Sequence, residues 1–281
     1  MSPIIFDGRL FAKEGEEKLR RAVLNLGKRG IKPKLVTILI GDNPGSVLYV
    51  NLKKKAAERI GAIAEVITLR SDIDEVGLRG IIKKYNFESS VHGIMVQLPL
   101  PTGLKDKTKE ILNEIDSQKD IDGLRINSTF VPATVKAILM ILEDAFRDLN
   151  IDKNKREKKI KKVVVVGSSG MVGAALVKLL AKLEYPVRGI DIETKEISEI
   201  TKNADILVSA TGVVGLVDVD MVKEGTIVID VGSPYGDVDF ENVSKKASFI
   251  TPVPGGIGPV TILSLLDNLI ISTGAVSVLQ D

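Results

Sequence analysis

The sequence contains no cysteine and no tryptophan, and its single histidine is His92. Without cysteine, the chain has no disulfide, no thiolate nucleophile and no cysteine-ligated metal. One histidine also excludes a metal site built from several imidazoles. We therefore expect no bound metal, and we look for chemistry among lysine, carboxylate, amide and backbone groups.

Long apolar runs and a strong net charge are missing as well. No uninterrupted apolar run approaches the ~20 residues that a membrane span needs. Residues 1–8 lack the basic-then-apolar layout of a signal peptide. The net charge is +2, from 39 basic and 37 acidic residues, so bulk attraction to nucleic acid or to an anionic membrane is not expected. These features predict a soluble, cytoplasmic protein without nucleic-acid or membrane partners.

The composition that remains is that of a globular protein. Hydrophobic residues make up 44% and charged residues 27% of the 281 positions, which is enough for one large domain or two ordinary ones.

Strands and helices alternate along the chain. The first part predicts strands at 35–40, 64–69 and 93–99, and helices at 13–30, 47–60 (capped by Ser46), 73–85 and 132–149. After the charge-rich run 152–162, interpreted as a solvated linker rather than a polyphosphate contact, the second part predicts strands at 162–166, 186–191, 206–210 and 226–231, with short helices between them. A final helix at 259–279 is expected to fold back on the first part.

This alternation is typical of an α/β protein with parallel sheets. We expect two domains. Residues 1–140 and 257–281 form a catalytic domain, and residues 141–256 form a Rossmann-like dinucleotide-binding domain, with the ligand site in the cleft between them.

The β-branched run 163–166 leads directly into a glycine turn and then a helix. Backbone N–H groups and the helix dipole in such a turn favour a phosphate. The glycines at 167, 170 and 173 have the spacing G-x-x-G-x-x-G, which differs from the usual G-x-G-x-x-G fingerprint. A plain strand-to-helix turn remains the alternative.

Polar side chains that could carry chemistry lie in the first part. Tyr49 and Lys53 are four residues apart and share a helix face. Gln97 lies in an apolar strand, where its amide needs partners. The turn Lys119–Gly123 (Lys-Asp-Ile-Asp-Gly) holds two carboxylates. Each feature also has a structural interpretation: a solvated pair, an amide satisfied by backbone, and an Asx turn.

Residues 251–259 (Thr-Pro-Val-Pro-Gly-Gly-Ile-Gly-Pro) form a stiff loop with exposed backbone, because they combine three prolines with three glycines. Solubility alone does not explain such a loop before a helix.

Together these segments resemble the bifunctional methylenetetrahydrofolate dehydrogenase/cyclohydrolase family. The resemblance rests on the helix with Tyr49 and Lys53, the string Gln-Leu-Pro-Leu-Pro that begins at Gln97, the Lys-Asp-Ile-Asp-Gly turn, the glycine turn 167–173, Asp230-Val231-Gly232, and the Pro-Val-Pro-Gly-Gly-Ile-Gly-Pro loop. They occur in the family's order and with its spacing over nearly the whole chain.

The resemblance implies two reactions on a one-carbon folate. Oxidation of 5,10-methylenetetrahydrofolate by NAD(P)+ gives the methenyl cation, and hydrolysis of that cation gives 10-formyltetrahydrofolate. It implies that Lys53 is the cyclohydrolase acid/base, that Gln97 orients it, that Tyr49 packs on the folate and that Asp122 binds the pterin edge.

By the same resemblance, Pro254, Gly255 and Gly256 contact the substrate, the protein is a homodimer, and its product serves purine biosynthesis. The alternatives are a dehydrogenase without cyclohydrolase activity and a nucleotide-binding protein without chemistry.

The resemblance also implies a set of cofactor-binding residues: Gly167, Ser168, Ser169, Met171, Val172, Gly173, Asp191, Thr211, Gly212 and Ser233. NADP is the expected cofactor, with NAD as the alternative.

The chain departs from the family in that set. Ser168 replaces an arginine that is common in the family and that would hold a 2′-phosphate. Asp191, an acid after the second strand, favours the NAD ribose. Arg188 and Lys195 are the basic residues that would retain NADP. The segment 125–134 is also shorter than usual, and its Pro-Ala-Thr replaces a common Pro-Cys-Thr-Pro, which changes the expected shape of the folate pocket.

Overall fold

The computed structural model describes residues 3–151 and 161–279. The expected linker at 152–162 therefore lies mostly outside the described residues. The chain divides into two compact units. One, which we call the three-stranded unit, comprises Ala12–Ala133 and Ile262–Asp281; the other, the six-stranded unit, comprises Met1–Phe11 and Thr134–Thr261. Every strand pairing in both units is parallel, as predicted.

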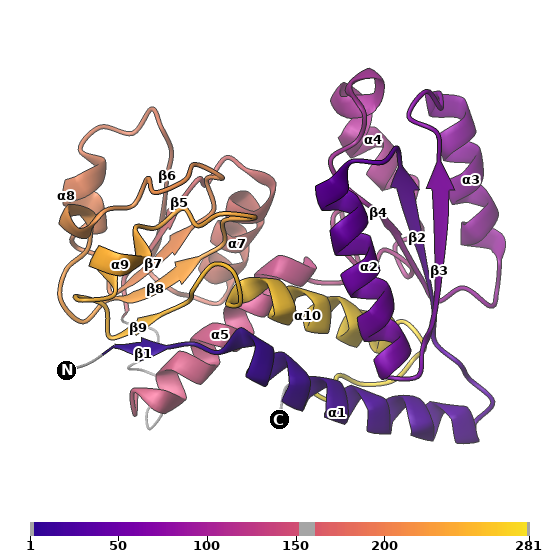
Figure 1. Ribbon diagram of the computed structural model, residues 1–281, viewed down its shortest axis with the longest axis horizontal. Helices are drawn as coiled ribbons and strands as arrows, with labels where there is room; N and C mark the ends of the chain where they lie inside the picture. The colour runs from indigo at the N-terminus through magenta and orange to yellow at the C-terminus, as the bar shows by residue number, and fades with distance from the viewer. Residues whose placement is uncertain (1–2, 152–160, 280–281) are drawn as a thin grey trace. The chain divides into compact units, whose positions relative to one another are not determined.

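The three-stranded unit has the strand order β3-β2-β4. Its elements alternate as the sequence predicts, and Figure 1 shows α2 and α3 on opposite sides of this sheet. The bounds are α1 (Gly8–Lys28), β2 (Lys34–Ile40), α2 (Pro44–Arg59), β3 (Ile63–Leu69), α3 (Glu75–Phe87), β4 (Gly93–Val96), η1 (Thr102–Lys107), α4 (Thr108–Asn113) and α10 (Ile257–Ile271). The first residues of α1 and of α10 belong to the six-stranded unit.

Helix α2 begins three residues earlier than predicted. The side chain of Asn43, not that of Ser46, caps the helix, because its Oδ1 accepts a hydrogen bond from the Ser46 backbone N–H at 3.1 Å. Pro44 occupies the first helical position, where its fixed φ fits and its missing N–H costs nothing. The prediction that Ser46 is the cap was wrong.

Helix α10 packs within the three-stranded unit, as predicted for the C-terminal helix, but it ends at Ile271 rather than at residue 279. A Cβ atom on Gly93 of β4 would lie 2.9 Å from a methyl carbon of Leu269, so glycine permits this close approach. The helix ends just before Gly274, whose φ of +84° suits a glycine beyond a helix C-terminus.

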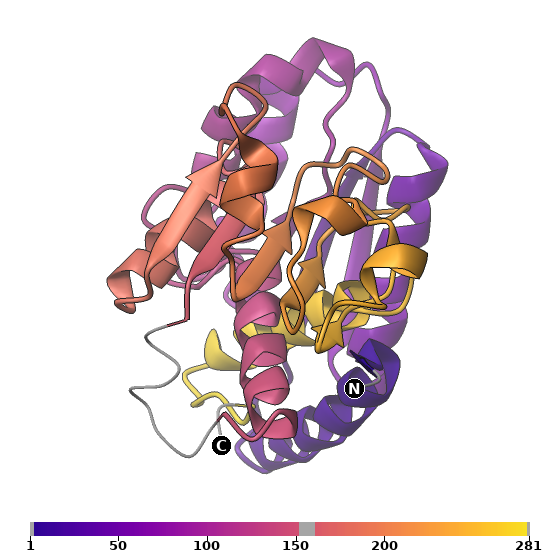
Figure 2. The same ribbon diagram turned by 90° about the vertical axis from the view of Figure 1, so that its left-hand side faces the viewer.

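The six-stranded unit has the strand order β1-β9-β8-β7-β5-β6. Figure 2 shows the structure with this unit turned toward the viewer. Its helices between strands are short, as expected, apart from α5 and α7. The bounds are β1 (Ile4–Ile5), α5 (Ala133–Asp148), β5 (Val163–Val166), α7 (Met171–Lys182), β6 (Val187–Ile190), α8 (Ile197–Thr201), β7 (Ile206–Ser209), η2 (Val219–Met221), β8 (Ile227–Asp230), α9 (Phe240–Val243) and β9 (Phe249–Ile250).

Strand β1 joins the N-terminus to the six-stranded unit, whereas the sequence places residues 1–140 in the expected catalytic domain. The Ile4 N–H donates to the Ser248 carbonyl and the Phe6 N–H to the Ile250 carbonyl, both at 2.9 Å. The ring of Phe6 is buried against Phe249, with centroids 5.7 Å apart. A strand of 2 residues has no periodicity that a sequence could reveal. The other boundaries fall at 133/134 and 261/262 instead of 140/141 and 256/257.

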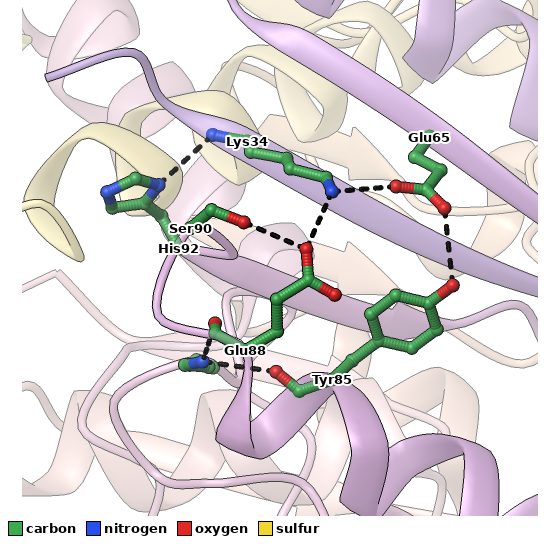
Figure 3. Close-up of polar contacts among 7 residues, drawn as sticks. Lys34, Glu65, Tyr85, Glu88, Ser90 and His92 are labelled. Carbon is green, nitrogen blue, oxygen red and sulfur yellow. Dashed lines mark hydrogen bonds and ion pairs between the residues drawn. The ribbon is translucent and has the colours of Figure 1, made fainter.

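A polar network lies where β2 and β4 begin (Figure 3). The Lys34 ammonium pairs with Glu65 at 2.8 Å and with Glu88 at 3.0 Å. The ring of His92 accepts a hydrogen bond from the Lys34 backbone N–H at 3.3 Å through Nδ1. The only histidine of the chain therefore joins two strand starts, at the end of the sheet opposite to Gln97.

No helix formed by residues 3–151 or 161–279 is long and apolar enough to cross a membrane.

Candidate active site

Gln97 and Lys53 meet at the carboxyl end of the three-stranded sheet. Gln97 directly follows β4, and its backbone N–H donates to the carbonyl of Ile38 at 2.8 Å. Its side-chain Nε2 donates to the Leu98 carbonyl at 2.6 Å, so Oε1 is left to face α2. There it accepts a hydrogen bond from Lys53 Nζ at 3.1 Å. The amide thus joins the end of a strand to a helix and fixes the position of the ammonium group.

Lys53 lies in surroundings that disfavour its charge. Its side chain is half-buried, and loss of hydration lowers the pKa of Lys53 below its ordinary value, while the charge of Asp122 partly opposes this. Lys34 of the same unit is shifted the other way, because the carboxylates of Glu65 and Glu88 raise its pKa. A lowered pKa is what a lysine needs in order to act as a base near neutral pH.

Asp122 reaches the same region through a loop that follows the edge of the sheet. The Ile94 N–H of β4 donates to the Lys119 carbonyl at 2.7 Å, and Ile94 and Asp120 form a parallel bridge. Burial raises the pKa of Asp122, and the nearby charge of Lys53 partly opposes this. Asp122 and Lys53 therefore influence each other electrostatically.

Three polar side chains hold this loop in place. Lys119 Nζ donates to the carbonyls of Tyr85, Asn86 and Glu88 at 3.1, 2.8 and 2.8 Å. These carbonyls lie at and just beyond the C-terminal end of α3, where a cation is favourable.

The carboxylate of Asp120 accepts the backbone N–H groups of Leu124 and Arg125 at 3.4 and 3.0 Å, and burial raises its pKa. Of the two carboxylates in the turn, Asp120 is therefore structural.

Asn268 is the third anchor, and sequence reasoning missed it. From α10, its Nδ2 donates to the carbonyls of Ile121 and Val131 at 2.9 and 3.1 Å, on either side of Asp122. An amide within a strongly apolar helix was the available signal, because such a group needs buried partners.

Tyr49 lies one helical turn before Lys53 on α2 and is half-buried. The positions four residues apart place both side chains on one helix face. Tyr49, Lys53, Gln97 and Asp122, four of the residues predicted for the folate site, thus all belong to the three-stranded unit.

The glycines of the turn after β5 allow close packing within the six-stranded unit. Gly167 has φ +85°, and a Cβ atom there would lie 2.5 Å from the Ala210 carbonyl oxygen. A Cβ atom on Gly173 would lie 2.1 Å from the Gly167 carbonyl oxygen, so only glycine allows α7 to pack on the turn. Gly170 caps α7 without a side-chain hydrogen bond. The N–H groups of the first turn, at Met171, Val172 and Gly173, therefore suit a phosphate.

Asp191 follows β6 and is brought to the two serines of this turn. Its carboxylate accepts hydrogen bonds from Ser168 Oγ at 2.6 Å and from Ser169 Oγ at 3.0 Å. The Asp191 backbone N–H donates to Thr194 Oγ1 at 3.0 Å. The Ser168 hydroxyl, followed by the groups of Ser169, holds the pKa of Asp191 below its usual value.

Thr211 and Gly212, after β7, are fixed by the buried carboxylate of Asp237. Its Oδ2 accepts from the Thr211 N–H at 2.6 Å, the Thr211 hydroxyl at 2.9 Å and the Gly212 N–H at 3.3 Å, as well as from Ser209 Oγ at 3.0 Å. Sequence reasoning assigned no role to Asp237, whose contacts join residues far apart in the chain.

A second buried carboxylate, Asp230, organises the turn that contains Ser233. It accepts from the N–H groups of Gly232, Asp237 and Val238 at 2.8, 3.0 and 3.0 Å. Burial raises the pKa of Asp230, and the charge of Asp237 adds to the effect. An acid at the end of an apolar strand was the signal for this role.

The loop with Pro254, Gly255 and Gly256 precedes α10 in the six-stranded unit. Gly255 has φ +107°, which a side chain rarely adopts, and the Gly256 N–H donates to the Pro252 carbonyl at 2.8 Å. A Cβ atom on Gly8 would lie 1.9 Å from the Gly256 carbonyl oxygen. The glycines are therefore required by the folding of the loop itself, whatever it binds.

Among the residues that the structure describes, no group of three or more His, Cys, Asp or Glu side chains is arranged to hold a metal ion.

Comparison with known proteins identifies two family domains in the chain. Residues 6–122 match the model of the catalytic domain of tetrahydrofolate dehydrogenase/cyclohydrolase, and residues 132–276 match that of its NAD(P)-binding domain. The chain belongs to the tetrahydrofolate dehydrogenase/cyclohydrolase family.

Relatives of this dehydrogenase/cyclohydrolase cover nearly its full length. The bifunctional protein FolD of Helicobacter hepaticus is 39% identical over 280 residues, which is 94% of each chain. The crystal structure of the bifunctional FolD dehydrogenase/cyclohydrolase from Campylobacter jejuni is similar with a TM-score of 0.87 at 39% identity, covering 96% of this chain and 98% of that one. The Trypanosoma brucei enzyme, complexed with NADP and an inhibitor, has a TM-score of 0.86 at 33% identity, covering 97% of each.

The dehydrogenase/cyclohydrolase reactions are therefore the activity of this chain: oxidation of 5,10-methylenetetrahydrofolate with NAD(P)+, and hydrolysis of the methenyl product to 10-formyltetrahydrofolate. The two α/β units with parallel sheets agree with the predicted fold class.

Proposed function

We propose that Lys53 is the acid/base of the cyclohydrolase reaction and that Gln97 orients it. The hydrogen bond of 3.1 Å from Lys53 Nζ to Gln97 Oε1 carries this assignment. The lowered pKa of Lys53 supports it, since a neutral amine can accept a proton from the attacking water. The methenyl carbon is part of a cation, and a positive charge nearby disfavours protonated lysine further.

Asp122 and Tyr49 bind the substrate in this proposal. An ionised carboxylate accepts two hydrogen bonds side by side, which matches the donor-rich edge of the pterin. Lys119, Asp120 and Asn268 hold the Asp122 loop firmly, as a recognition residue requires. Tyr49 offers an aromatic face one turn from Lys53. That Pro254, Gly255 and Gly256 contact the substrate is carried over from the family resemblance alone.

The glycine turn and its neighbours hold the dinucleotide. The first-turn N–H groups of α7 suit its phosphates. The assignment of Thr211, Gly212 and Ser233 to the same site comes from the family resemblance, and Asp237 holds Thr211 and Gly212 in place by accepting their N–H groups. When bound, NAD(P)+ accepts the hydride from the bridging methylene. The resemblance to the family implies NADP, with NAD as the alternative.

Replacing Lys53 by methionine tests the central assignment. We expect Lys53→Met to abolish hydrolysis of 5,10-methenyltetrahydrofolate, followed by the decay of its absorbance without dinucleotide. Lys54→Met is the matched control, because Lys54 is the next residue of α2 and is exposed; it should retain the wild-type rate.

Unchanged hydrolysis in Lys53→Met would remove Lys53 from this role. A wild-type protein that reduces NAD(P)+ but never accelerates methenyl decay would be a monofunctional dehydrogenase, and one that binds nucleotide without either reaction would be a binding protein.

We also propose, from the family resemblance, a cytoplasmic homodimer whose product enters purine biosynthesis. Light scattering after size-exclusion chromatography should give twice the mass of 30.3 kDa. A monomeric mass at working concentration would contradict the dimer.

A further inference from the structure

The end of β6 presents an unusual combination of groups to the adenosine side of a dinucleotide. In parallel sheets that bind dinucleotides, the acid after the second strand contacts the adenosine ribose. Asp191 occupies that position, and hydroxyls from the phosphate-binding turn reach it at 2.6 Å (Ser168) and 3.0 Å (Ser169). A Cβ atom on Gly189 would lie 2.6 Å from Cβ of Ser168, so the glycine in β6 makes room for this contact.

The hydrogen bonds among Ser168, Ser169 and Asp191 use every side-chain donor of the three residues, so only acceptor atoms are left for a ligand. Each serine hydroxyl has one proton, and both protons are used on the Asp191 carboxylate. The oxygen lone pairs of the hydroxyls and of the carboxylate remain. A ribose 2′-hydroxyl is a donor and fits such a set, whereas a 2′-phosphate is an acceptor and finds no partner in it.

The local charge has the same consequence. Asp191, Glu193 and Glu196 contribute three carboxylates to the turn after β6, and Lys195 contributes the single ammonium group. A 2′-phosphate would add about two negative charges to this turn. The family arginine that would neutralise it is replaced by Ser168.

Arg188 does not compensate for the missing arginine. Successive residues of a strand point to opposite faces of the sheet. Gly189, on the face that carries α7, is followed by Ile190, which is buried in the cluster on the other face. Arg188 is two residues before Ile190 and therefore points to the same face as Ile190, away from α7. Asp191 is two residues after Gly189 and points to the face of α7, where it contacts Ser168 and Ser169.

We propose that Asp191, clamped by Ser168 and Ser169, selects NAD over NADP in this enzyme by accepting a hydrogen bond from the ribose 2′-hydroxyl and repelling a 2′-phosphate. The inference rests on the proposed dinucleotide site and decides between its two cofactors. It opposes the NADP preference that the family resemblance implies.

The first test compares kcat/KM for the two cofactors with saturating 5,10-methylenetetrahydrofolate. The wild type should favour NAD+ by at least about 10-fold. Asp191→Asn keeps the size of the side chain and removes its charge, so it should shift the NAD+/NADP+ ratio toward NADP+ by about 10- to 100-fold, the scale of one hydrogen bond to a charged group.

Glu193→Gln is the matched control. Glu193 lies two residues after Asp191 and its side chain is exposed, so this variant removes a charge of the same sign from a neighbouring position. It should change the ratio less than about 3-fold, because exposed charges act weakly through water. A shift as large as that of Asp191→Asn would assign selectivity to the general charge of the turn and overturn the clamp.

The affinity of the wild-type protein for each dinucleotide is a second measurement. It requires no catalysis and does not depend on whether a variant folds. Titration calorimetry of the full wild-type chain with NAD+ and with NADP+, without folate, should give the lower Kd for NAD+. The difference should shrink as salt is raised, because ions screen the repulsion of the phosphate. Equal binding, or tighter NADP+ binding, would overturn the proposal.

These results are separable from those on the proposed site. Methenyl hydrolysis requires no dinucleotide, so its loss or survival in Lys53→Met leaves the cofactor comparison untouched. Conversely, an NADP+ preference would remove the assigned function of Asp191 and leave the folate chemistry standing.

Discussion

Two lysines of the three-stranded unit, Lys34 and Lys53, demonstrate how surroundings set chemistry at the level of a single residue. Lys34 pairs with two carboxylates, which raise its pKa, and Lys53 faces an uncharged amide in a poorly hydrated place, which lowers its pKa. Gln97 therefore positions the amine without adding a negative charge.

Introducing that charge should disable the base near neutral pH. Gln97→Glu is nearly isosteric and places a carboxylate where Oε1 is 3.1 Å from Lys53 Nζ. An opposite charge this close raises a lysine pKa by about 1–3 units. The rising limb of the cyclohydrolase pH–rate profile should move to higher pH by a similar amount. A profile that stays in place would indicate that Lys53 is not the titrating base.

The proposed role of Asp122 predicts that KM for the folate depends on pH in the acidic range. The pKa of Asp122 is raised by burial, and in the role proposed for it only the ionised carboxylate would accept two hydrogen bonds from the pterin. As pH falls through this raised pKa, KM for the folate should increase at a pH above the 3.8 of an ordinary aspartate. Asp122→Asn, which does not titrate, should have a higher KM throughout and lose this dependence. A wild-type KM that stays independent of pH down to 3.8 would contradict the assignment.

At the scale of elements, the order of strands and helices follows from apolar periodicity, and most bounds agree within a few residues. The pairing of Lys53 with Gln97 was expected from the family resemblance, which implied that Gln97 orients Lys53. Asn268 was not, since the carbonyl of Ile121 that it binds lies 147 residues away. Strand β1 was not predicted from the sequence, because a strand of 2 residues has no detectable periodicity. The start of α2 was placed too late, because the helix begins at a proline.

The contact between α7 and the glycine turn can be tested for its role in dinucleotide binding. Gly173→Ala places a Cβ atom where the Gly167 carbonyl oxygen lies 2.1 Å away, so the helix must move off the turn. Dinucleotide binding and dehydrogenase activity should be lost, while methenyl hydrolysis, assigned to the other unit, should continue.

Gly80→Ala is the control for that variant. A Cβ atom at Gly80, within α3, meets no atom within 4 Å, and alanine in a helix interior should add about 0.5–1 kcal/mol of stability. Both activities should survive. Full dehydrogenase activity in Gly173→Ala would show that the turn tolerates displacement.

At the scale of the whole molecule, the N-terminal segment stabilises a unit whose other residues begin at position 134. Phe6 is 4% exposed and packs on Phe11 and Phe249. Phe6→Ala should cost about 3–5 kcal/mol of unfolding free energy, measured by denaturant titration. Leu10→Ala, at a position that is 53% exposed, is the control and should cost far less. A negligible loss in Phe6→Ala would mean that β1 contributes little to the sheet.

The unit boundaries at 11/12, 133/134 and 261/262 mean that the polypeptide passes from one unit to the other three times. Neither unit is one continuous stretch of the gene. No single stop codon or proteolytic nick liberates either in intact form, and recombination that exchanges one for a homologous copy needs three junctions. The two compact units are thus built from interleaved stretches of one polypeptide.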